Sequence, residues 1–254
     1  TIRMLEQYIG PDNFRQGLHD YLSKHAYGNA RTEDLWAALE GSSKMAVSSV
    51  MNTWIKQAGY PLITVETSDG DKETVVKATQ KRFLYENILG SEEVDSSWKI
   101  PINIASAGNQ SITSHLLENR EEQLFVNKDN SSKEPEYLKM NFGESGFFRV
   151  NYSDKDWATL RSSVENLNLP AIDRLGLQND CFALARAGYL KGIDFLTFAK
   201  SYKAENNAIV WRDLTANMQA FERLIYQEDY WKQFQKYALN IYSDIVKTVG
   251  WSKR

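Results

Sequence analysis

Cysteine is almost absent from this sequence, in which Cys181 is the only one among 254 residues. A single cysteine cannot form an internal disulfide and cannot supply the ligands of a thiolate metal site. This usage favours the cytoplasm as the compartment, with a secreted or membrane-anchored ectodomain as the alternative. Three Asn-x-Ser triplets, which begin at Asn109, Asn130 and Asn151, support the alternative, because such triplets are glycosylated only in secreted proteins.

An excess of charge of one sign is also lacking, since 30 Lys and Arg stand against 33 Asp and Glu. The net charge of -3 leaves no basic surface for nucleic acid or for an anionic membrane. No apolar run approaches the roughly 20 residues that span a bilayer, so we expect no membrane-spanning segment. The hydrophobic content of 42% is enough for two or three compact units, and the oligomeric state stays open.

The three histidines, His19, His25 and His115, do not have the spacing of a metal site. A helical zinc site needs two imidazoles one turn apart, as in His-Glu-x-x-His, so that both face one ion. His19 and His25 are six residues apart, and His115 lies alone in a candidate strand. We therefore predict no metal ligand, and no bound cofactor, in this chain.

Other candidates for chemistry have simpler structural explanations. Cys181 lies between Asp180 and Phe182 on an apolar helical stretch, which favours a packed thiol over a nucleophile. The segment 143–146, Gly-Glu-Ser-Gly, has the wrong glycine spacing for a nucleophile elbow and is predicted to be a turn. A group of aromatic residues either lines a peptide groove or, as its helical spacing favours, packs in a core; it comprises Tyr226, Tyr230, Trp231, Phe234 and Tyr237. No catalytic residue is predicted, and the substrate-binding residues stay unknown.

The hydrophobic period changes twice along the chain. It is helical up to about residue 58, becomes two between Pro61 and Tyr152, and is helical again from Ser153, where Ser153 and Asp156 form a capping pattern. The middle segment contains seven candidate strands, at 62–66, 73–79, 98–104, 110–116, 122–126, 137–141 and 147–152, which predict an antiparallel sandwich. Trp98, Ile100, Ile102 and Ile104 should form one buried face of a strand that alternates with polar positions. Pro101 would then require an edge or a bulge.

These changes predict three segments: residues 1–59, residues 60–152 and residues 153–254. The first residues enter a helical stripe without an approach loop, and the last follow a helical stripe without a stop signal. We therefore expect both ends to be cuts through a longer protein.

Four segments together resemble zinc aminopeptidases of the aminopeptidase N and puromycin-sensitive type, which belong to the gluzincin group. Residues 2–40 (IRMLEQYIGPDNFRQGLHDYLSKHAYGNARTEDLWAALE) are similar to the stretch that follows the zinc motif in that family. Three further segments resemble the entry into a small β-sandwich, the exit from it, and the first helices of a helical domain; they are 51–65 (MNTWIKQAGYPLITV), 146–160 (GFFRVNYSDKDWATL) and 173–190 (DRLGLQNDCFALARAGYL). The resemblance covers essentially the whole chain in the family's order.

The resemblance implies a multidomain α and β architecture: the helical tail of a thermolysin-like catalytic domain, an antiparallel β-sandwich, and the start of an α-helical domain. It implies a parent that uses zinc to remove N-terminal residues from peptides. The family's His-Glu-x-x-His helix and its Gly-x-Met-Glu-Asn loop are not in this sequence. We therefore expect an internal, inactive piece, and the alternative is a non-catalytic peptide- or protein-binding module with the same architecture.

Overall fold

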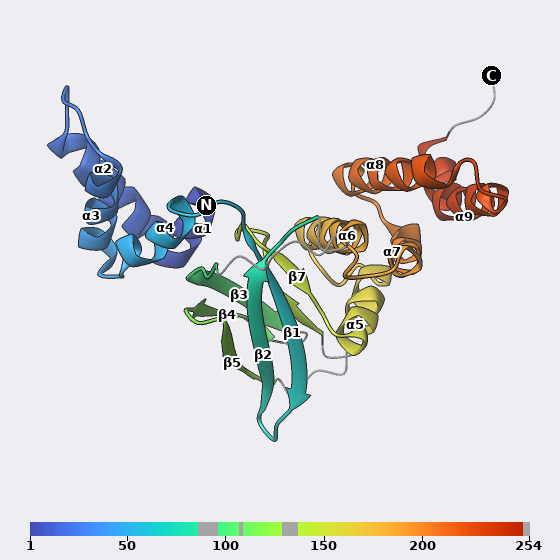
Figure 1. Cartoon of the computed structure of the whole chain (residues 1–254), viewed down its shortest axis with the longest axis horizontal. Coiled ribbons are helices and arrows are strands. Elements are labelled where there is room, and N and C mark those ends of the chain that lie inside the picture. Colours follow the sequence, from blue (N-terminus) through green and yellow to red (C-terminus); the bar gives the residue numbers. More distant parts are fainter. Residues whose placement is uncertain (86–95, 107–108, 129–136, 251–254) are drawn as a thin grey trace. The chain divides into compact units, whose positions relative to one another are not determined.

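Figure 1 shows a computed structural model of the chain, which describes residues 1–85, 96–106, 109–128 and 137–250. For strand residues 109–111 only the backbone is described. The described residues divide into two compact units. Unit 1 contains those of 1–83 and 96–152, and unit 2 contains residues 84, 85 and 153–250.

Unit 1 begins with the helices α1 (Ile2–Ile9), α2 (Pro11–Lys24), α3 (Thr32–Ser43) and α4 (Val47–Ile55). Pro11 is the first residue of α2, where its missing N–H would have had no partner within the helix. The apolar stripes of these helices meet in one buried cluster of Leu5, Ile9, Trp36, Leu39, Val47 and Met51. The helical period predicted for this part of the chain is confirmed.

Helices α2 and α3 approach each other most tightly at Gly17. A Cβ atom at this position would lie 2.7 Å from Leu39 Cδ2 and 2.7 Å from Ser42 Oγ. Because glycine leaves this space free, the hydroxyl of Ser42 can donate a hydrogen bond of 2.8 Å to the carbonyl oxygen of Asn13. The two helices are thereby fixed to each other by packing and by one long-range polar contact.

The rest of unit 1 forms two small sheets. The first has the order β5-β2-β1-β7, with β1 (Pro61–Asp69), β2 (Glu73–Arg82), β5 (Glu121–Asn127) and β7 (Arg149–Asn151). The second has the order β4-β3-β6, with β3 (Ile100–Ser106), β4 (Asn109–Leu117) and β6 (Leu138–Met140). All seven predicted strands are present among the described residues.

The prediction that every strand pair is antiparallel is wrong for β7. This strand runs parallel to β1, with Leu62 opposite Arg149 and Thr64 opposite Asn151. Antiparallel neighbours are usually joined by a short hairpin, whereas parallel neighbours require a long connection. Strand β7 follows β6, which belongs to the other sheet, so the chain changes sheets before it reaches the free edge of β1.

Strand β3 is the centre of the second sheet. Trp98, Ile100, Ile102 and Ile104 are all at most 1% exposed, as predicted. The intervening positions are not exposed, because all seven residues of β3 are buried and helix α1 also packs against this strand. Pro101 pairs with Leu116 of β4, and β6 reaches only Ile104–Ser106, so at Pro101 the strand has one neighbour. The proline is thus tolerated at a local edge.

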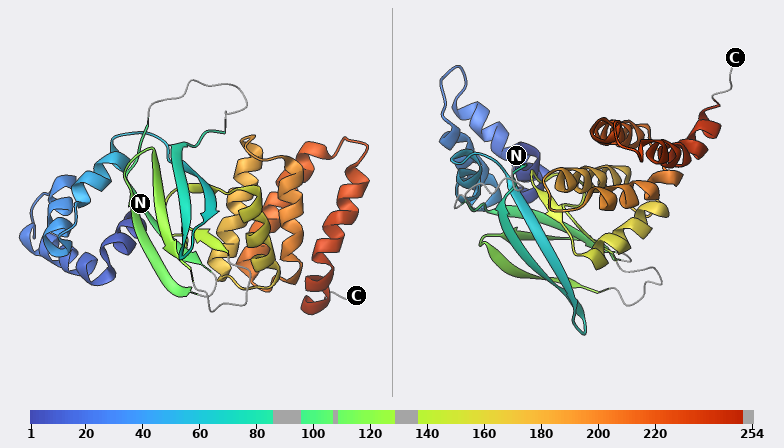
Figure 2. Two further views of the ribbon diagram at one scale, coloured as in Figure 1. Left: turned by 90° about the horizontal axis from the view of Figure 1, so that it is seen from below. Right: turned by 45° about the vertical axis from the view of Figure 1, so that its right-hand side comes forward.

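Unit 2 is helical, with α5 (Asp154–Glu165), α6 (Ala171–Arg186), α7 (Gly192–Ala199), a 3₁₀ turn η2 (Lys200–Ala204), α8 (Ala208–Ile225) and α9 (Trp231–Val249). Helix α6 packs against α7 and α8, and α8 packs against α9 (Figure 2). The predicted cap of α5 is confirmed, because Ser153 Oγ accepts a hydrogen bond of 3.2 Å from Asp156 N. Within the part of the chain that the structure describes, no helix is long and apolar enough to cross a membrane.

Replacing Ile100 by Asp should lower the free energy of unfolding of unit 1 by at least about 3 kcal/mol, because a carboxylate opposite the buried Leu117 would lie unpaired in the core. Gln123→Asp is the matched control, since Gln123 is exposed on β5 opposite Lys77. Urea titration followed by circular dichroism measures both variants. Equal midpoints for the two variants would contradict the assignment of the buried face.

Candidate functional site

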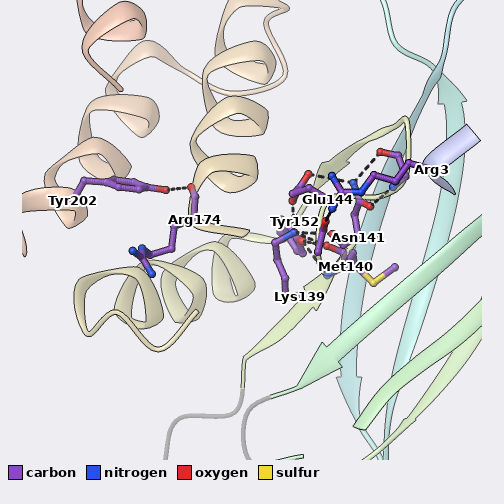
Figure 3. Close-up of polar contacts among 10 residues, drawn as sticks. Arg3, Lys139, Met140, Asn141, Glu144, Tyr152, Arg174 and Tyr202 are labelled. Atoms are coloured by element: carbon purple, nitrogen blue, oxygen red, sulfur yellow. Dashed lines mark hydrogen bonds and ion pairs between the residues drawn. The ribbon is translucent and has the colours of Figure 1, made fainter. Parts of the chain in front are cut away.

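The turn after β6 in unit 1 is built around a buried lysine. The side chain of Lys139 is only 2% exposed, and its Nζ lies 2.7 Å from Glu144 Oε1 and 2.7 Å from the carbonyl oxygen of Met140 (Figure 3). A buried ammonium group is stable only when it is paired and its protons are satisfied by acceptors. These contacts meet that requirement, so the pair fixes the turn to the end of β6.

The backbone of this turn adopts a conformation that most residues avoid. Asn141, Gly143 and Glu144 have φ angles of 52°, 78° and 51°, all in the left-handed region. The amide of Asn141 stabilises the turn, because its Oδ1 accepts a hydrogen bond of 2.8 Å from Gly146 N. Arg3 Nη2 of α1 donates a hydrogen bond of 3.3 Å to the carbonyl oxygen of Gly143 (Figure 3). The predicted turn at 143–146 is confirmed, and the strand β7 follows it in place of a helix.

A second buried ion pair lies in unit 2 and connects α6 to the start of α8. Arg174 Nε and Nη2 donate hydrogen bonds of 2.6 and 2.7 Å to the two carboxylate oxygens of Glu205. Arg174 Nη1 also donates to the carbonyl oxygen of Leu169, and the Tyr202 hydroxyl donates a bond of 2.6 Å to the carbonyl oxygen of Arg174 (Figure 3). The pair is bidentate, and each of the three guanidinium nitrogens has an acceptor. A buried ion pair needs both features to be stable.

Glu205 also organises the chain between η2 and α8. Its Oε1 accepts hydrogen bonds from the backbone N–H groups of Asn206 and Asn207, at 2.9 and 2.8 Å. Burial raises the pKa of the Glu205 carboxyl, but the hydrogen bonds from Arg174 and from these two N–H groups outweigh burial and hold that pKa below its ordinary value. The carboxylate is therefore a structural anion.

Cys181 does not have the properties of a nucleophile. Its side chain is buried in α6, and burial, with Asp194 and Asp180 nearby, raises the pKa of the thiol well above its ordinary value. Cys181 lines a cavity of about 150 Å³ with Trp157, Phe198 and other residues of unit 2. Because the thiolate is the reactive form, a thiol that stays protonated near neutral pH is inert. The prediction of a packed thiol is thus supported by burial and by electrostatics.

The histidines lie in separate elements. His19 is exposed on α2, with Nδ1 3.4 Å from Asp20 Oδ1, and His25 follows the last residue of α2. His115 lies on β4 opposite Ile102. Among the residues that the structure describes, no three or more His, Cys, Asp and Glu side chains form a group that could hold a metal ion.

The predicted aromatic group divides between core and surface. Phe234 is buried and stacks on Phe221, with ring centroids 5.6 Å apart. Tyr237 donates a hydrogen bond to the carbonyl oxygen of Leu196, whereas Tyr226 and Tyr230 are more than half exposed. None of these five residues lines the groove described next.

Sequence reasoning missed a groove of about 600 Å³ between α8 and α9. Its lining is mostly apolar and comprises Ala208, Trp211, Arg212, Thr215, Ala216, Gln219, Tyr242, Ile245, Val246 and Val249. The only sequence signal is that Trp211, Thr215 and Gln219 are four residues apart. This spacing places the three side chains on one face of a helix, but it does not distinguish a groove from a core.

Comparison with known proteins finds two family models. The model described as the peptidase family M1 domain matches residues 1–54, and the model described as the ERAP1-like C-terminal domain matches residues 137–254. The two matches lie near opposite ends of the chain.

Curated relatives match nearly the whole chain. Aminopeptidase M1 of Arabidopsis thaliana is 35% identical over 85% of this chain and 25% of its own length. Glutamyl aminopeptidase of Homo sapiens is 34% identical over 99% of this chain and 26% of its own length. Alanine/arginine aminopeptidase of Saccharomyces cerevisiae is 31% identical over 99% of this chain and 28% of its own length. The chain therefore spans about a quarter of the length of the relatives it matches.

Glu205→Gln should destabilise unit 2 by about 3–5 kcal/mol, because the isosteric amide leaves the buried guanidinium of Arg174 without a counter-charge. Asp244→Asn is the control, since Asp244 pairs with Lys203 and Lys247 at the surface. Thermal unfolding followed by circular dichroism compares the variants with the unchanged chain. A melting temperature of Glu205→Gln equal to that of the control would show that the buried pair is not needed.

His115 should make unit 1 less stable as the pH falls below about 6.5. Its Nε2 is buried with no hydrogen-bond partner among the described residues, and burial lowers the pKa of the imidazole from 6.5 in the folded state. As the pH falls, His115 is protonated in the unfolded state before it is protonated in the folded state. The free energy of unfolding therefore decreases as the pH falls.

The measurement is the free energy of unfolding at pH 7.5 and pH 5.5, from urea titrations. His115→Leu should lose less stability between these pH values than the unchanged chain, and Gln123→Leu, at an exposed position of β5, should lose the same amount. An unchanged pH dependence in His115→Leu would exclude a contribution from this imidazole.

Proposed function

This chain belongs to peptidase family M1, and we propose that it is a scaffold segment of a zinc-dependent aminopeptidase that removes N-terminal residues from peptides. The observation that carries the proposal is the order of the two family matches, at residues 1–54 and 137–254, together with aminopeptidase relatives that align along nearly the whole chain. Zinc and the peptide substrate are proposed for the whole enzyme, of which this chain is about a quarter by length.

The described residues of this chain form no group that fits a zinc ion. His19 lies on α2 and His25 just after its end, His115 lies on β4, and the single thiol is buried with a raised pKa. Peptide hydrolysis by a zinc enzyme needs an activated water and a stabilised oxyanion together. We therefore assign no catalytic residue to this chain and propose that it is inactive by itself.

Its proposed role is mechanical and follows its three segments. Residues 1–59 are the helical tail of a thermolysin-like catalytic domain, residues 60–152 are a β-sandwich, and residues 153–254 begin a helical domain. The helical cluster of α1–α4 and the two sheets support the first two segments, although both lie in unit 1. The division into two units near Ser153 supports the boundary between the second and the third segment. Buried ion pairs at Lys139 and Arg174 suit elements that hold a fixed shape.

The alternative is a non-catalytic module that binds a peptide or a protein. The groove between α8 and α9 supports it, because its volume of about 600 Å³ and its mostly apolar lining are typical of ligand sites. A polypeptide of this kind would keep the architecture of the family without its chemistry.

We propose the cytoplasm as the compartment, with a secreted or membrane-anchored ectodomain as the alternative. One of the three triplets is engaged by the fold: Asn151 lies in β7 with a buried Oδ1, and the hydroxyl of Ser153 caps α5. The Asn130 triplet lies outside the described residues, as does the side chain of Asn109. The Asn151 triplet therefore gives no support to the ectodomain alternative.

This chain alone should not hydrolyse aminoacyl fluorogenic amides, whereas a longer polypeptide of its parent that includes a zinc helix should. The reason is that the described residues form no group that could hold the metal ion needed to activate water. Both polypeptides are assayed with added zinc and with a chelator, and their zinc content is measured by elemental analysis.

Chelator-sensitive turnover by the short chain, or about one zinc bound per chain, would show that the active site is misplaced. A folded, zinc-loaded long polypeptide without turnover would favour the binding module.

A further inference from the structure

The stretch Ser97–Lys99 in unit 1 is held by side chains on both sides. It lies directly before β3 and outside the strand ladders. On one side is Gln80 of β2, whose Oε1 accepts a hydrogen bond of 2.8 Å from Trp98 N and whose Nε2 donates one of 2.8 Å to Trp98 O. The amide of Gln80 thus binds Trp98 as a neighbouring strand would, with one donor and one acceptor.

On the other side, helix α4 supplies two hydrogen bonds, and Gln57, which follows the helix, supplies a third. Thr53 Oγ1 accepts from Lys99 N at 3.1 Å, and Trp54 Nε1 donates to Lys99 O at 2.9 Å. Gln57 Nε2 donates to the carbonyl oxygen of Ser97 at 2.7 Å. Five backbone groups of the stretch are therefore satisfied by side chains from α4, from the segment after it and from the other sheet.

Trp98, the middle residue of the stretch, is buried, so its two bonds to Gln80 are protected from water, and the bonds of Ser97 and Lys99 are partly buried. Trp98 is 0% exposed and Gln80 is 6% exposed, and the rings of Trp98 and Trp54 lie 6.3 Å apart. A buried backbone group that loses its partner carries the full cost of desolvation. Apolar packing alone is non-directional, whereas these bonds fix α4 in one register on the strands.

We infer that Thr53, Trp54 and Gln80 are positioning residues, which clamp Ser97–Lys99 and so hold α4 and strands β2 and β3 together as one rigid body. Helix α4 belongs almost entirely to the segment matched by the peptidase family M1 model, and the strands lie outside both matched segments. The inference deepens the proposed scaffold function and rests on it for its purpose. The clamp joins the sheets to the peptidase segment, together with the packing of α1 against β3 and the hydrogen bond from Arg3 to Gly143.

Hydrogen exchange of single amides, measured by NMR on this chain, tests the clamp without an activity assay. Gln80→Leu should speed exchange of the Trp98 amide by about tenfold or more and leave the Lys99 amide protected, because only Trp98 N donates to Gln80. Thr53→Val, which keeps the side-chain shape, should do the opposite.

The rigid coupling has its own readout. In the unchanged chain, the α4 amides from Met51 to Ile55 and the amides of β2 should exchange through openings of equal free energy, as one cooperative unit. In the double variant Gln80→Leu with Thr53→Val, the α4 amides should exchange about tenfold faster than those of β2. Gln123→Leu, at an exposed position of β5, is the control and should change neither.

Equal protection of α4 and β2 in the double variant would overturn the inference. So would a loss of protection of both the Trp98 and the Lys99 amide in either single variant. If Gln80→Leu does not fold, the test is carried by Thr53→Val, in which α4 must again exchange faster than β2. These outcomes do not depend on turnover, so a failure of the clamp and a failure of the proposed function are distinguishable.

Discussion

The hydrogen bonds of the Gln80 amide are the contacts on which unit 1 depends most. Without them, the backbone of Trp98 would enter the core with an unsatisfied N–H and an unsatisfied carbonyl oxygen, and such groups are rare in folded proteins. Gln80 Nε2 also donates to the carbonyl oxygen of Asn119, which follows β4. A single side chain of the first sheet therefore connects both ends of the β3–β4 hairpin, and β3 is the central strand of the second sheet.

The two buried ion pairs solve a related problem at two other junctions. Lys139 and Glu144 hold a turn with three left-handed residues, and Arg174 and Glu205 hold the entry to α8. Apolar residues in place of such pairs are often at least as stabilising, so stability alone does not explain them. Their common property is direction: in each pair at least one charged group also binds backbone carbonyl or N–H groups nearby, and the pair so determines one conformation of a connection.

The sequence predicts the elements of this fold well, because hydrophobic period and turn residues are local signals. The alternation at Ile100, Ile102 and Ile104 identifies β3, and Ser153 identifies the start of α5.

The sequence predicts contacts between distant elements poorly. A glutamine in a strand is normally solvent-exposed, and the partners of Gln80 are 18 and 39 residues away. The parallel pairing of β7 and the groove between α8 and α9 likewise depend on where whole elements pack, for which a single sequence has no periodic signal.

The solitary thiol of Cys181 has a practical consequence. Since Cys181 is buried and protonated in the native state, an alkylating reagent would react with it only when α6 becomes exposed. The rate at which Cys181 is alkylated therefore measures the opening of unit 2, and no added label is needed. The same property leaves the surface free of thiols, so a cysteine introduced at an exposed position would be a unique attachment point for a spectroscopic probe.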